Sequence, residues 1–277
     1  MTSEQAKRLE DFRSELHISH SQIFTYLNCS LKYCFSYVEG RMPEHRPAAM
    51  LFGSAIHAAI ARYYKGVQKK GKPEPLSLHQ DLFHDYWNWE TEDTGIPIAY
   101  KGGQNKDSML NEGQLLVKIF YERAQPMEVI GVEEPYSSVL YDEEGNPTDF
   151  KLIGIVDCIQ RDKNGNLIII DNKTANRAYS QDKIEQDLQM TVYSYLAAAS
   201  RLVPAKSETL HRFDVLLKLK QPRLDVYHTT RSTADRKRLA KIINRVLKGI
   251  EAGVFFPNPS WMCRDCQYAQ ACVKWST

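Results

Sequence analysis

A predicted β-hairpin near the middle of the chain constrains the fold more than any other feature. Two apolar runs with strand propensity, residues 150–160 and 166–173, flank Asp162-Lys-Asn-Gly165. This stretch suits a type I turn with Gly165 in the left-handed region, the arrangement that closes a three-residue hairpin loop with a bulge. Segments with helical periodicity lie on both sides of the hairpin, so the chain is predicted to be mixed α and β.

The bulged turn decides which polar side chains meet. Its register places Asp157 directly across from Asp171 on one face, with Cβ atoms about 5 Å apart. Lys173 lies two residues beyond Asp171 and projects from the same face. A two-residue Asn164-Gly165 turn would instead shift the register and put the two aspartates on opposite faces.

Two carboxylates this close repel each other unless a cation lies between them, and oxygen ligands favour Mg²⁺ or Mn²⁺. Such a metal polarises a phosphoryl oxygen and lowers the pKa of a bound water, while Lys173 orients that water or stabilises developing negative charge. The pattern therefore predicts phosphodiester hydrolysis. The alternative for a single D-x-K triplet is an ordinary surface hairpin with opposed charges.

The composition is that of an ordinary globular protein. Hydrophobic residues make up 43% and charged residues 25% of the 277, with 36 Lys and Arg against 34 Asp and Glu. These values exclude a disordered, collagen-like or coiled-coil chain. No segment approaches the roughly 20 apolar residues that span a bilayer, and the charged first residues lack a signal-peptide core. We therefore expect a cytoplasmic protein with no membrane partner.

The cysteines are concentrated at the end of the chain. Cys263, Cys266 and Cys272 form a C-x2-C-x5-C cluster, whose spacing allows several thiolates to converge on one metal centre. A fourth ligand must come from elsewhere in the chain. Zinc and an iron–sulfur cluster both accept four thiolates, so the spacing alone leaves them open. Cys158 lies within a strand and is expected to pack in the core.

Several motifs together resemble the PD-(D/E)XK nuclease superfamily, and within it the RecB-type nucleases and their iron–sulfur relatives, which include CRISPR-associated adaptation nucleases. The resemblance implies an α/β fold with a small mixed sheet flanked by helices. It spans most of the chain in the family's order. The matching segments are Ser21-Gln-Ile-Phe-Thr-Tyr-Leu-Asn-Cys29, Phe52-Gly-Ser-Ala-Ile-His57, Gly154-Ile-Val-Asp157, Ile170-Asp-Asn-Lys173, Gln189-Met-Thr-Val-Tyr193 and Phe256-Pro-Asn-Pro-Ser260.

The resemblance also implies roles for individual residues. Lys173 would act on the attacking water, and Gln189 and Tyr193, four apart on one helix face, would border the site as catalytic residues. The alternative for Tyr193 is core packing. The implied metal contacts are His57, Asp157, Asp171 and the carbonyl of Asn172.

Two of these assignments have rivals in the sequence. For His57 the alternative is a buried, hydrogen-bonded helix histidine. In some relatives a glutamate on the first strand also reaches the site. Glu133 is the candidate here, and Glu134 directly follows it.

A [4Fe–4S] cluster is the second cofactor that the resemblance implies. Its ligands would be Cys29, Cys263, Cys266 and Cys272, which would tie the two ends of the chain into a cap. Cys34 is a rival for Cys29, because five residues on a helix turn by about 140° and only one of the two can face the cluster. The helix itself is predicted from the capping box at Ser19 and Gln22 to Gly40.

We therefore expect a single RecB-like nuclease domain over residues 1–277. Its parts are the first helix with its cluster cysteine (18–40), the nuclease core (50–252) and the cluster-binding segment (253–277). The activity implied is metal-dependent DNA hydrolysis, as an exonuclease on single-stranded ends. No G-x4-G-K-[ST] motif occurs, so unwinding would need a helicase or a recombination or adaptation partner.

Two other classes of function remain open. The first is a non-catalytic DNA-binding or assembly subunit, and the second is a zinc-stabilised interaction module. For the nuclease, DNA contact would use local basic groups and exposed aromatic rings, and the alternative for each basic group is an ordinary solvated face. The basic candidates lie in loops 69–72 and 101–106 and near the last long helix, at Arg231, Arg236, Lys237, Arg238 and Lys241. The aromatic candidates are Trp87, Trp89 and Tyr100, with at least one tryptophan expected in the core.

Overall fold

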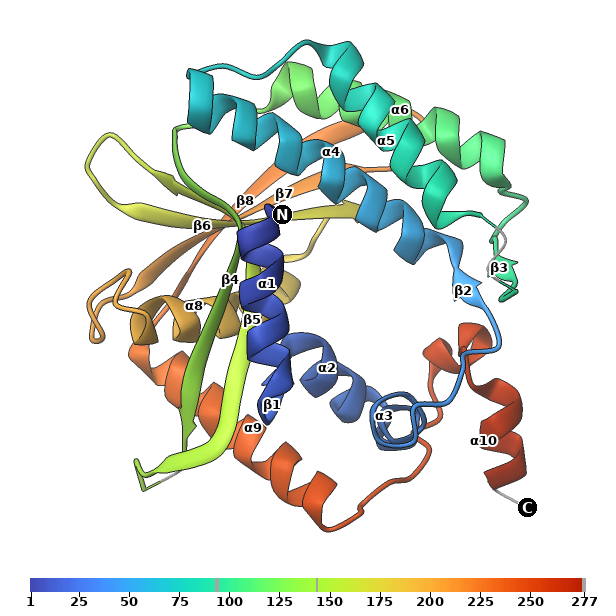
Figure 1. Ribbon diagram of the computed structural model, residues 1–277, viewed down its shortest axis with the longest axis vertical. Coiled ribbons are helices and arrows are strands. Elements are labelled where there is room, and N and C mark those ends of the chain that lie inside the picture. The colour runs from blue at the N-terminus through green and yellow to red at the C-terminus, as the bar shows by residue number, and fades with distance from the viewer. Residues whose placement is uncertain (93–94, 143, 276–277) are drawn as a thin grey trace.

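The computed structural model describes residues 1–92, 95–142 and 144–275. Within them, six strands form one mixed sheet at the centre of the molecule (Figure 1). A separate short pair, β2 (Arg46–Pro47) and β3 (Ile98–Ala99), lies apart from it. The strands of the main sheet are β1 (His17–Ser19), β4 (Glu128–Tyr141), β5 (Pro147–Arg161), β6 (Leu167–Ala175), β7 (Thr209–Leu217) and β8 (Arg223–Arg231).

Strand β5 organises the sheet. Antiparallel β4 pairs with it along one edge, and its other edge is shared by β1 at the start and β6 at the end. The β1 ladder covers residues 151–153 and the β6 ladder residues 158–161, so in the described part of the chain residues 154–157 have no strand partner on that edge. Beyond this point β6 continues to pair with β7. Strands β5 and β6 therefore diverge at residues 157 and 171, and we call this place the fork.

The predicted hairpin turn and its register are confirmed. Gly165 has φ 85° and donates to the Asp162 carbonyl at 3.0 Å, and the Asp162 N–H donates to Asn166 O at 2.9 Å. Cys158 pairs with Ile170 in the ladder. The ladder ends at that pair, so the two aspartates lie just beyond it, where the strands separate.

Helices cover both faces of the sheet (Figure 1). On one face α4, α5 and α6 pack onto apolar side chains of β4 to β7, and Phe52, Phe83 and Trp87 are fully buried among them. On the other face α8 and α9 pack onto β5 to β7. The bounds are α1 (Ser3–Ser14), α4 (Ala48–Lys70), α5 (Leu76–Glu90), α6 (Lys106–Arg123), α7 (Gln181–Glu185), α8 (Leu188–Ala199) and α9 (Thr233–Glu251).

The single helix predicted from residue 19 to residue 40 is wrong in its length. The capping box is present, with Ser19 Oγ accepting from Gln22 N and Gln22 Oε1 from Ser19 N. However, α2 (His20–Asn28) ends at Cys29, which has φ −161° and ψ 102°. Helix α3 (Ser30–Tyr33) and a π-helix over Cys34–Val38 follow.

The helix breaks because another segment of the chain binds its backbone there. The N–H of Leu31 donates to Phe256 O at 3.1 Å, and Ser30 Oγ accepts from Phe256 N at 2.9 Å. Cys29 Sγ accepts from Lys32 N at 3.5 Å and so caps the new helix. A tertiary contact with residues far along the chain thus replaces the local helical hydrogen bonds.

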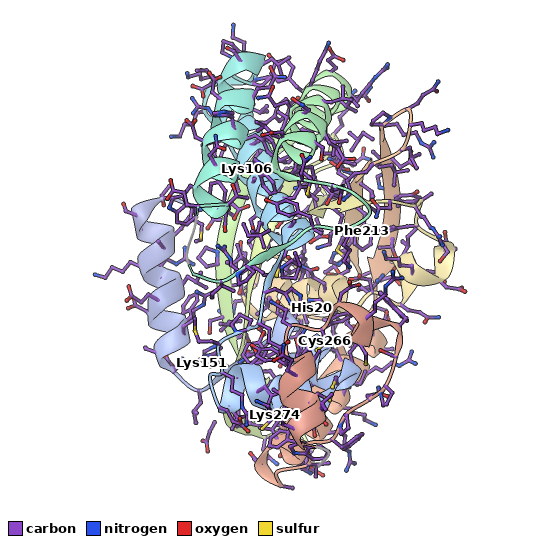
Figure 2. The ribbon with its side chains drawn as sticks, turned by 90° about the vertical axis from the view of Figure 1, so that its right-hand side faces the viewer. His20, Lys106, Lys151, Phe213, Cys266 and Lys274 are labelled. Carbon is purple, nitrogen blue, oxygen red and sulfur yellow. The ribbon has the colours of Figure 1, made fainter. Side chains whose placement is uncertain are left out.

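The C-terminal segment of the chain forms a cap beside α3, whereas the N-terminal helix α1 lies apart from it along β4 (Figure 1). The 3-10 helix η2 (Trp261–Asp265) and helix α10 (Ala269–Trp275) carry the C-terminal cysteines, and Figure 2 labels Cys266 on this segment. Gln267 O accepts from Glu44 N at 2.8 Å, and Lys101 Nζ lies 2.7 Å from Asp265 Oδ2. Residues 276 and 277 of the predicted cluster segment lie outside the described residues. No helix in the described part of the chain is long and apolar enough to cross a membrane.

Candidate active site

Three side chains that are far apart in the sequence converge at the fork. They are His57 from α4, Glu133 from β4 and Asp157 from β5, and one nitrogen or oxygen atom from each lies within 4.8 Å of the others. His57 Nδ1 is 3.3 Å from Asp157 Oδ2. An imidazole and two carboxylates from three different elements form a ligand set that suits a divalent metal ion.

The structure separates Glu133 from Glu134. Val132 pairs with Cys158 and Glu134 with Val156, so Glu133 lies across from Asp157 in the β4–β5 ladder. Glu133 has φ 56°, a left-handed conformation that is uncommon for a residue other than glycine. Glu134 instead accepts a hydrogen bond from Gln5 Nε2 of α1 at 2.8 Å. The sequence did not decide which of the two glutamates reaches the site. In the structure it is Glu133, and Glu134 faces α1.

Asp157 is held in place by the neighbouring strand. It is 9% exposed, and its Oδ2 accepts the backbone N–H of Asn172 at 2.8 Å. This bond closes the fork with a side chain after the β5–β6 ladder has ended. The sequence predicted a metal contact through the Asn172 carbonyl, and what the structure shows for Asn172 is this N–H donor.

The remaining predicted residues form a connected polar ring. Lys173 Nζ lies 2.9 Å from Asp171 Oδ2 and donates to Asp171 Oδ1 at 3.1 Å and to Gln189 Oε1 at 2.8 Å. Gln189 Nε2 donates to the Tyr193 hydroxyl at 2.7 Å, and that hydroxyl is 3.5 Å from Asp171 Oδ1. Tyr193 is 3% exposed, so it both packs in the core and borders the site.

Burial shapes the charges at the fork. It raises the pKa of Glu133 to about 6, and the Asp157 carboxylate adds to the effect. Burial likewise raises the pKa of Asp171 to about 6, which Lys173 opposes and Asp157 reinforces. For Lys173, burial alone would lower the pKa, but Asp171 and Asp157 raise it above its usual value. Lys173 is therefore an ammonium at neutral pH, and a divalent cation would stabilise the crowded carboxylates.

The raised pKa of Glu133 predicts how the metal-free protein responds to pH. Between pH 4.5 and 6 the unfolded chain loses this proton while the folded chain keeps it, so stability falls as pH rises through that window. The shift corresponds to about 2 kcal/mol. Glu133→Gln cannot titrate and so removes this penalty. In EDTA, the difference in unfolding free energy between the variant and wild type should therefore shift by about 2 kcal/mol in favour of the variant from pH 4 to pH 7. Urea unfolding at both pH values measures it, and a pH-independent difference between the two proteins would contradict it.

A large cavity opens beside the metal-ligand set. It measures about 940 Å³ and is walled mainly by α4 and α5. Arg62, Lys65 and Tyr86 line it together with His57 and Glu133. Trp89, which is 61% exposed, contacts Tyr86 with ring centroids 5.4 Å apart. The cavity therefore has basic and aromatic groups next to the acidic site.

Two of the basic residues proposed for DNA contact have a different role. Arg231 is 2% and Arg236 6% exposed. Arg231 donates to the carbonyls of Ile184 and Asp187, which fixes the start of α8, and Arg236 donates to carbonyls in the loop after α8. The predicted DNA contact is wrong for these two arginines, and so is the alternative of a solvated face, because both side chains are buried. Of the tryptophans, Trp87 is fully buried as expected for at least one of them.

The four cysteines predicted to share a centre lie around one cavity of about 280 Å³. Cys29, Cys263, Cys266 and Cys272 all line it. Burial raises the pKa of the Cys272 thiol, and the other three sulfurs raise it further. Cys34 does not line this cavity and instead contacts Glu39 Oε1 at 3.5 Å. Cys158 is fully buried in the core, as predicted.

A mixed sheet with carboxylates, a histidine and a lysine gathered where two strands diverge is the arrangement that a metal-dependent hydrolase of the nuclease type requires. The chain belongs to the PD-(D/E)XK nuclease superfamily, whose family model matches residues 17–273. Enzymes of this superfamily are metal-dependent nucleases.

A solved structure shares the fold at low sequence identity. A candidate exonuclease from Eubacterium rectale is 15% identical, with 97% of this chain and 92% of that one covered and a TM-score of 0.54. The structure of SSO0001 is 13% identical, with 88% and 93% covered and a TM-score of 0.41. No curated protein matches the sequence.

Proposed function

We propose that this protein is a Mg²⁺- or Mn²⁺-dependent deoxyribonuclease that degrades DNA from single-stranded ends. The observation that carries the proposal is the convergence of His57, Glu133 and Asp157 within 4.8 Å, beside the Lys173–Asp171 pair. Membership of a nuclease superfamily supports the reaction class.

Each residue has a role that follows from its contacts. His57, Glu133 and Asp157 would hold the metal, and Asp171 would contribute from the opposite strand of the fork. When bound, the metal supplies a polarised phosphoryl oxygen and an acidified water. Lys173, held by Asp171 and Gln189, presents its ammonium to the negative charge that develops on the phosphate.

The larger cavity supports a single-stranded substrate. Lys65 offers positive charge to phosphates, whereas the charge of Arg62 is balanced in part by its ion pair with Glu74 at 2.8 Å. Tyr86 with the exposed Trp89 offers rings on which unpaired bases stack. The exonuclease description of the Eubacterium rectale protein is consistent with action at ends. Because the sequence has no P-loop motif, a helicase or a recombination or adaptation complex would supply single strands from duplex DNA.

The cysteine cavity supports a [4Fe–4S] cluster held by Cys29, Cys263, Cys266 and Cys272. Four thiolates on one tetrahedral Zn²⁺ would lie about 3.8 Å from each other. In the described part of the chain, no three cysteine sulfurs lie within 4.8 Å of one another. The cavity that the four cysteines line could hold a cofactor with several metal atoms, which would fasten the cap to the nuclease core.

The test is cleavage of three DNA substrates of the same sequence in Mg²⁺ and in Mn²⁺. They are linear single strands labelled at either end, linear duplex and circular single strands. We expect degradation of the linear single strand, with the label that is released first reporting the polarity, and resistance of the circle. Cleavage of the circle at the same rate would contradict action at ends. Binding of every substrate without cleavage would favour the alternative of a non-catalytic DNA-binding subunit.

A further inference from the structure

A second, smaller cavity lies on the other flank of the metal-ligand set. It measures about 290 Å³ and is walled by α1, α2, α8 and the start of the fork in β5. The two cavities share Ser21, Glu133 and Ile155. His57 lines only the larger cavity, Asp157 only the smaller one, and Glu133 lines both. The metal-ligand set is therefore the partition between them.

This partition fixes where a substrate strand would lie. A phosphodiester at His57, Glu133 and Asp157 has one neighbouring nucleotide on each side, so a bound strand enters both cavities. The larger cavity, at about 940 Å³, has room for several nucleotides. The smaller one, at about 290 Å³, is at the lower end of the size of small-ligand sites, which fits one nucleotide.

The chemistry of the smaller cavity also suits a nucleotide. Arg13, on the last turn of α1, lines it and is exposed, and among the described residues no carboxylate forms an ion pair with it. Leu9, Ile153 and Val192 give it buried apolar walls. A guanidinium beside apolar surface matches a phosphate attached to a base and sugar.

His20 completes the cavity at the start of α2, where Figure 2 labels it. Burial lowers its pKa to about 4, with Asp187 opposing and Lys173 reinforcing the effect. His20 is therefore neutral at pH 7 and offers a ring N–H without charge. The positive charge of the smaller cavity comes from Arg13.

We propose that the smaller cavity binds the terminal nucleotide of the DNA strand, with Arg13 holding its phosphate, so that the enzyme releases mononucleotides. The proposal rests on the proposed function and adds the step size and the residue that sets it. It also makes a claim independent of cleavage, because the same cavity would bind a free deoxynucleoside monophosphate.

Equilibrium binding of deoxyadenosine 5′-monophosphate and its 3′ isomer tests the site directly. At least one isomer should bind wild type more tightly than deoxyadenosine or inorganic phosphate does. Arg13→Ala should weaken that binding at least about tenfold. The matched control is Lys7→Ala, which removes an exposed cation from the same helix outside both cavities and should bind as wild type does. Equal binding by the Arg13 and Lys7 variants, or nucleotide binding no tighter than phosphate, would overturn the proposal.

Product analysis separates this proposal from the nuclease proposal. With end-labelled single-stranded DNA, wild type should release labelled mononucleotide as its first product. A first product of two or more nucleotides would overturn the smaller cavity as the terminal site while leaving the nuclease in place. Conversely, Arg13-dependent nucleotide binding by a protein that cleaves no DNA would support the site and reject the nuclease.

Discussion

Lys173→Ala is expected to lower the rate constant for DNA cleavage, kcat, by at least about 100-fold, with a small change in KM. The ammonium of Lys173 is held at 2.9 Å from Asp171 Oδ2 and 2.8 Å from Gln189 Oε1, and its pKa is raised by the surrounding carboxylates. It therefore carries a fixed positive charge at neutral pH, whose electrostatic effect is greatest when the phosphate gains charge. Single-turnover cleavage of labelled single-stranded DNA measures the loss.

The matched control is Lys163→Ala. Lys163 lies in the exposed turn of the same hairpin, so the variant loses the same charge and should cleave as wild type does. Because Lys173→Ala leaves Asp171 buried beside Asp157, thermal unfolding and circular dichroism must first show that the variant is folded. A folded Lys173→Ala protein that cleaves within a few-fold of wild type would contradict the assigned role.

Replacement of one of the four cysteines proposed to hold a [4Fe–4S] cluster should detach the cap. Cys266→Ser in anaerobically purified protein is expected to lose the iron content and the brown colour, and to lower Tm by several degrees, because metal binding contributes directly to folding free energy. The cap is otherwise held by a small apolar cluster around Leu31, Phe35 and Tyr268 and by hydrogen bonds such as that between Glu44 N and Gln267 O. Limited proteolysis should then cut the segment after residue 253 more rapidly.

Cys34→Ser is the control for this experiment. Cys34 is buried near the cap but lines no part of the cysteine cavity, so its replacement should leave the iron content unchanged. A colourless wild-type protein that contains zinc, or equal iron content in Cys266→Ser and wild type, would contradict the cluster proposal.

The pairing of Asp157 and Asp171 at the fork could be predicted from the sequence because the residues of a turn determine its conformation locally. The Asp162-Lys-Asn-Gly165 turn determines the β5–β6 register, and that register brings Asp157 and Asp171 to one place. The capping box at Ser19 was predictable for the same reason, since its two hydrogen bonds join residues three apart.

Local sequence could not predict which of Glu133 and Glu134 reaches the metal-ligand set. Neighbouring strand residues point to opposite faces, and a shift of one residue exchanges them. The β4–β5 register depends on an irregularity between Val129 and Gly131, and on the left-handed conformation of Glu133 itself. A sequence pattern of two adjacent glutamates carries neither piece of information.

The end of α2 and the burial of Arg231 were also beyond the sequence, because both depend on distant partners. Cys29 ends the helix where Phe256, more than two hundred residues away, hydrogen-bonds to the backbone N–H of Leu31 and the side-chain hydroxyl of Ser30. Arg231 is buried because carbonyls of Ile184 and Asp187 accept its donors. From its charge alone, the Arg231 side chain was predicted to be exposed.

We propose above that a divalent metal held by His57, Glu133 and Asp157 supports DNA hydrolysis. The most direct test of this proposal is cleavage of linear single-stranded DNA by wild type and Asp157→Asn, each in Mg²⁺ and in EDTA. The asparagine oxygen still accepts the N–H of Asn172, so the fork is preserved while the charge that binds metal is lost. We predict that wild type cleaves the DNA in Mg²⁺ but not in EDTA, and that Asp157→Asn cleaves it in neither condition. Equal Mg²⁺-dependent cleavage by both proteins, or undiminished wild-type cleavage in EDTA, would contradict the proposal.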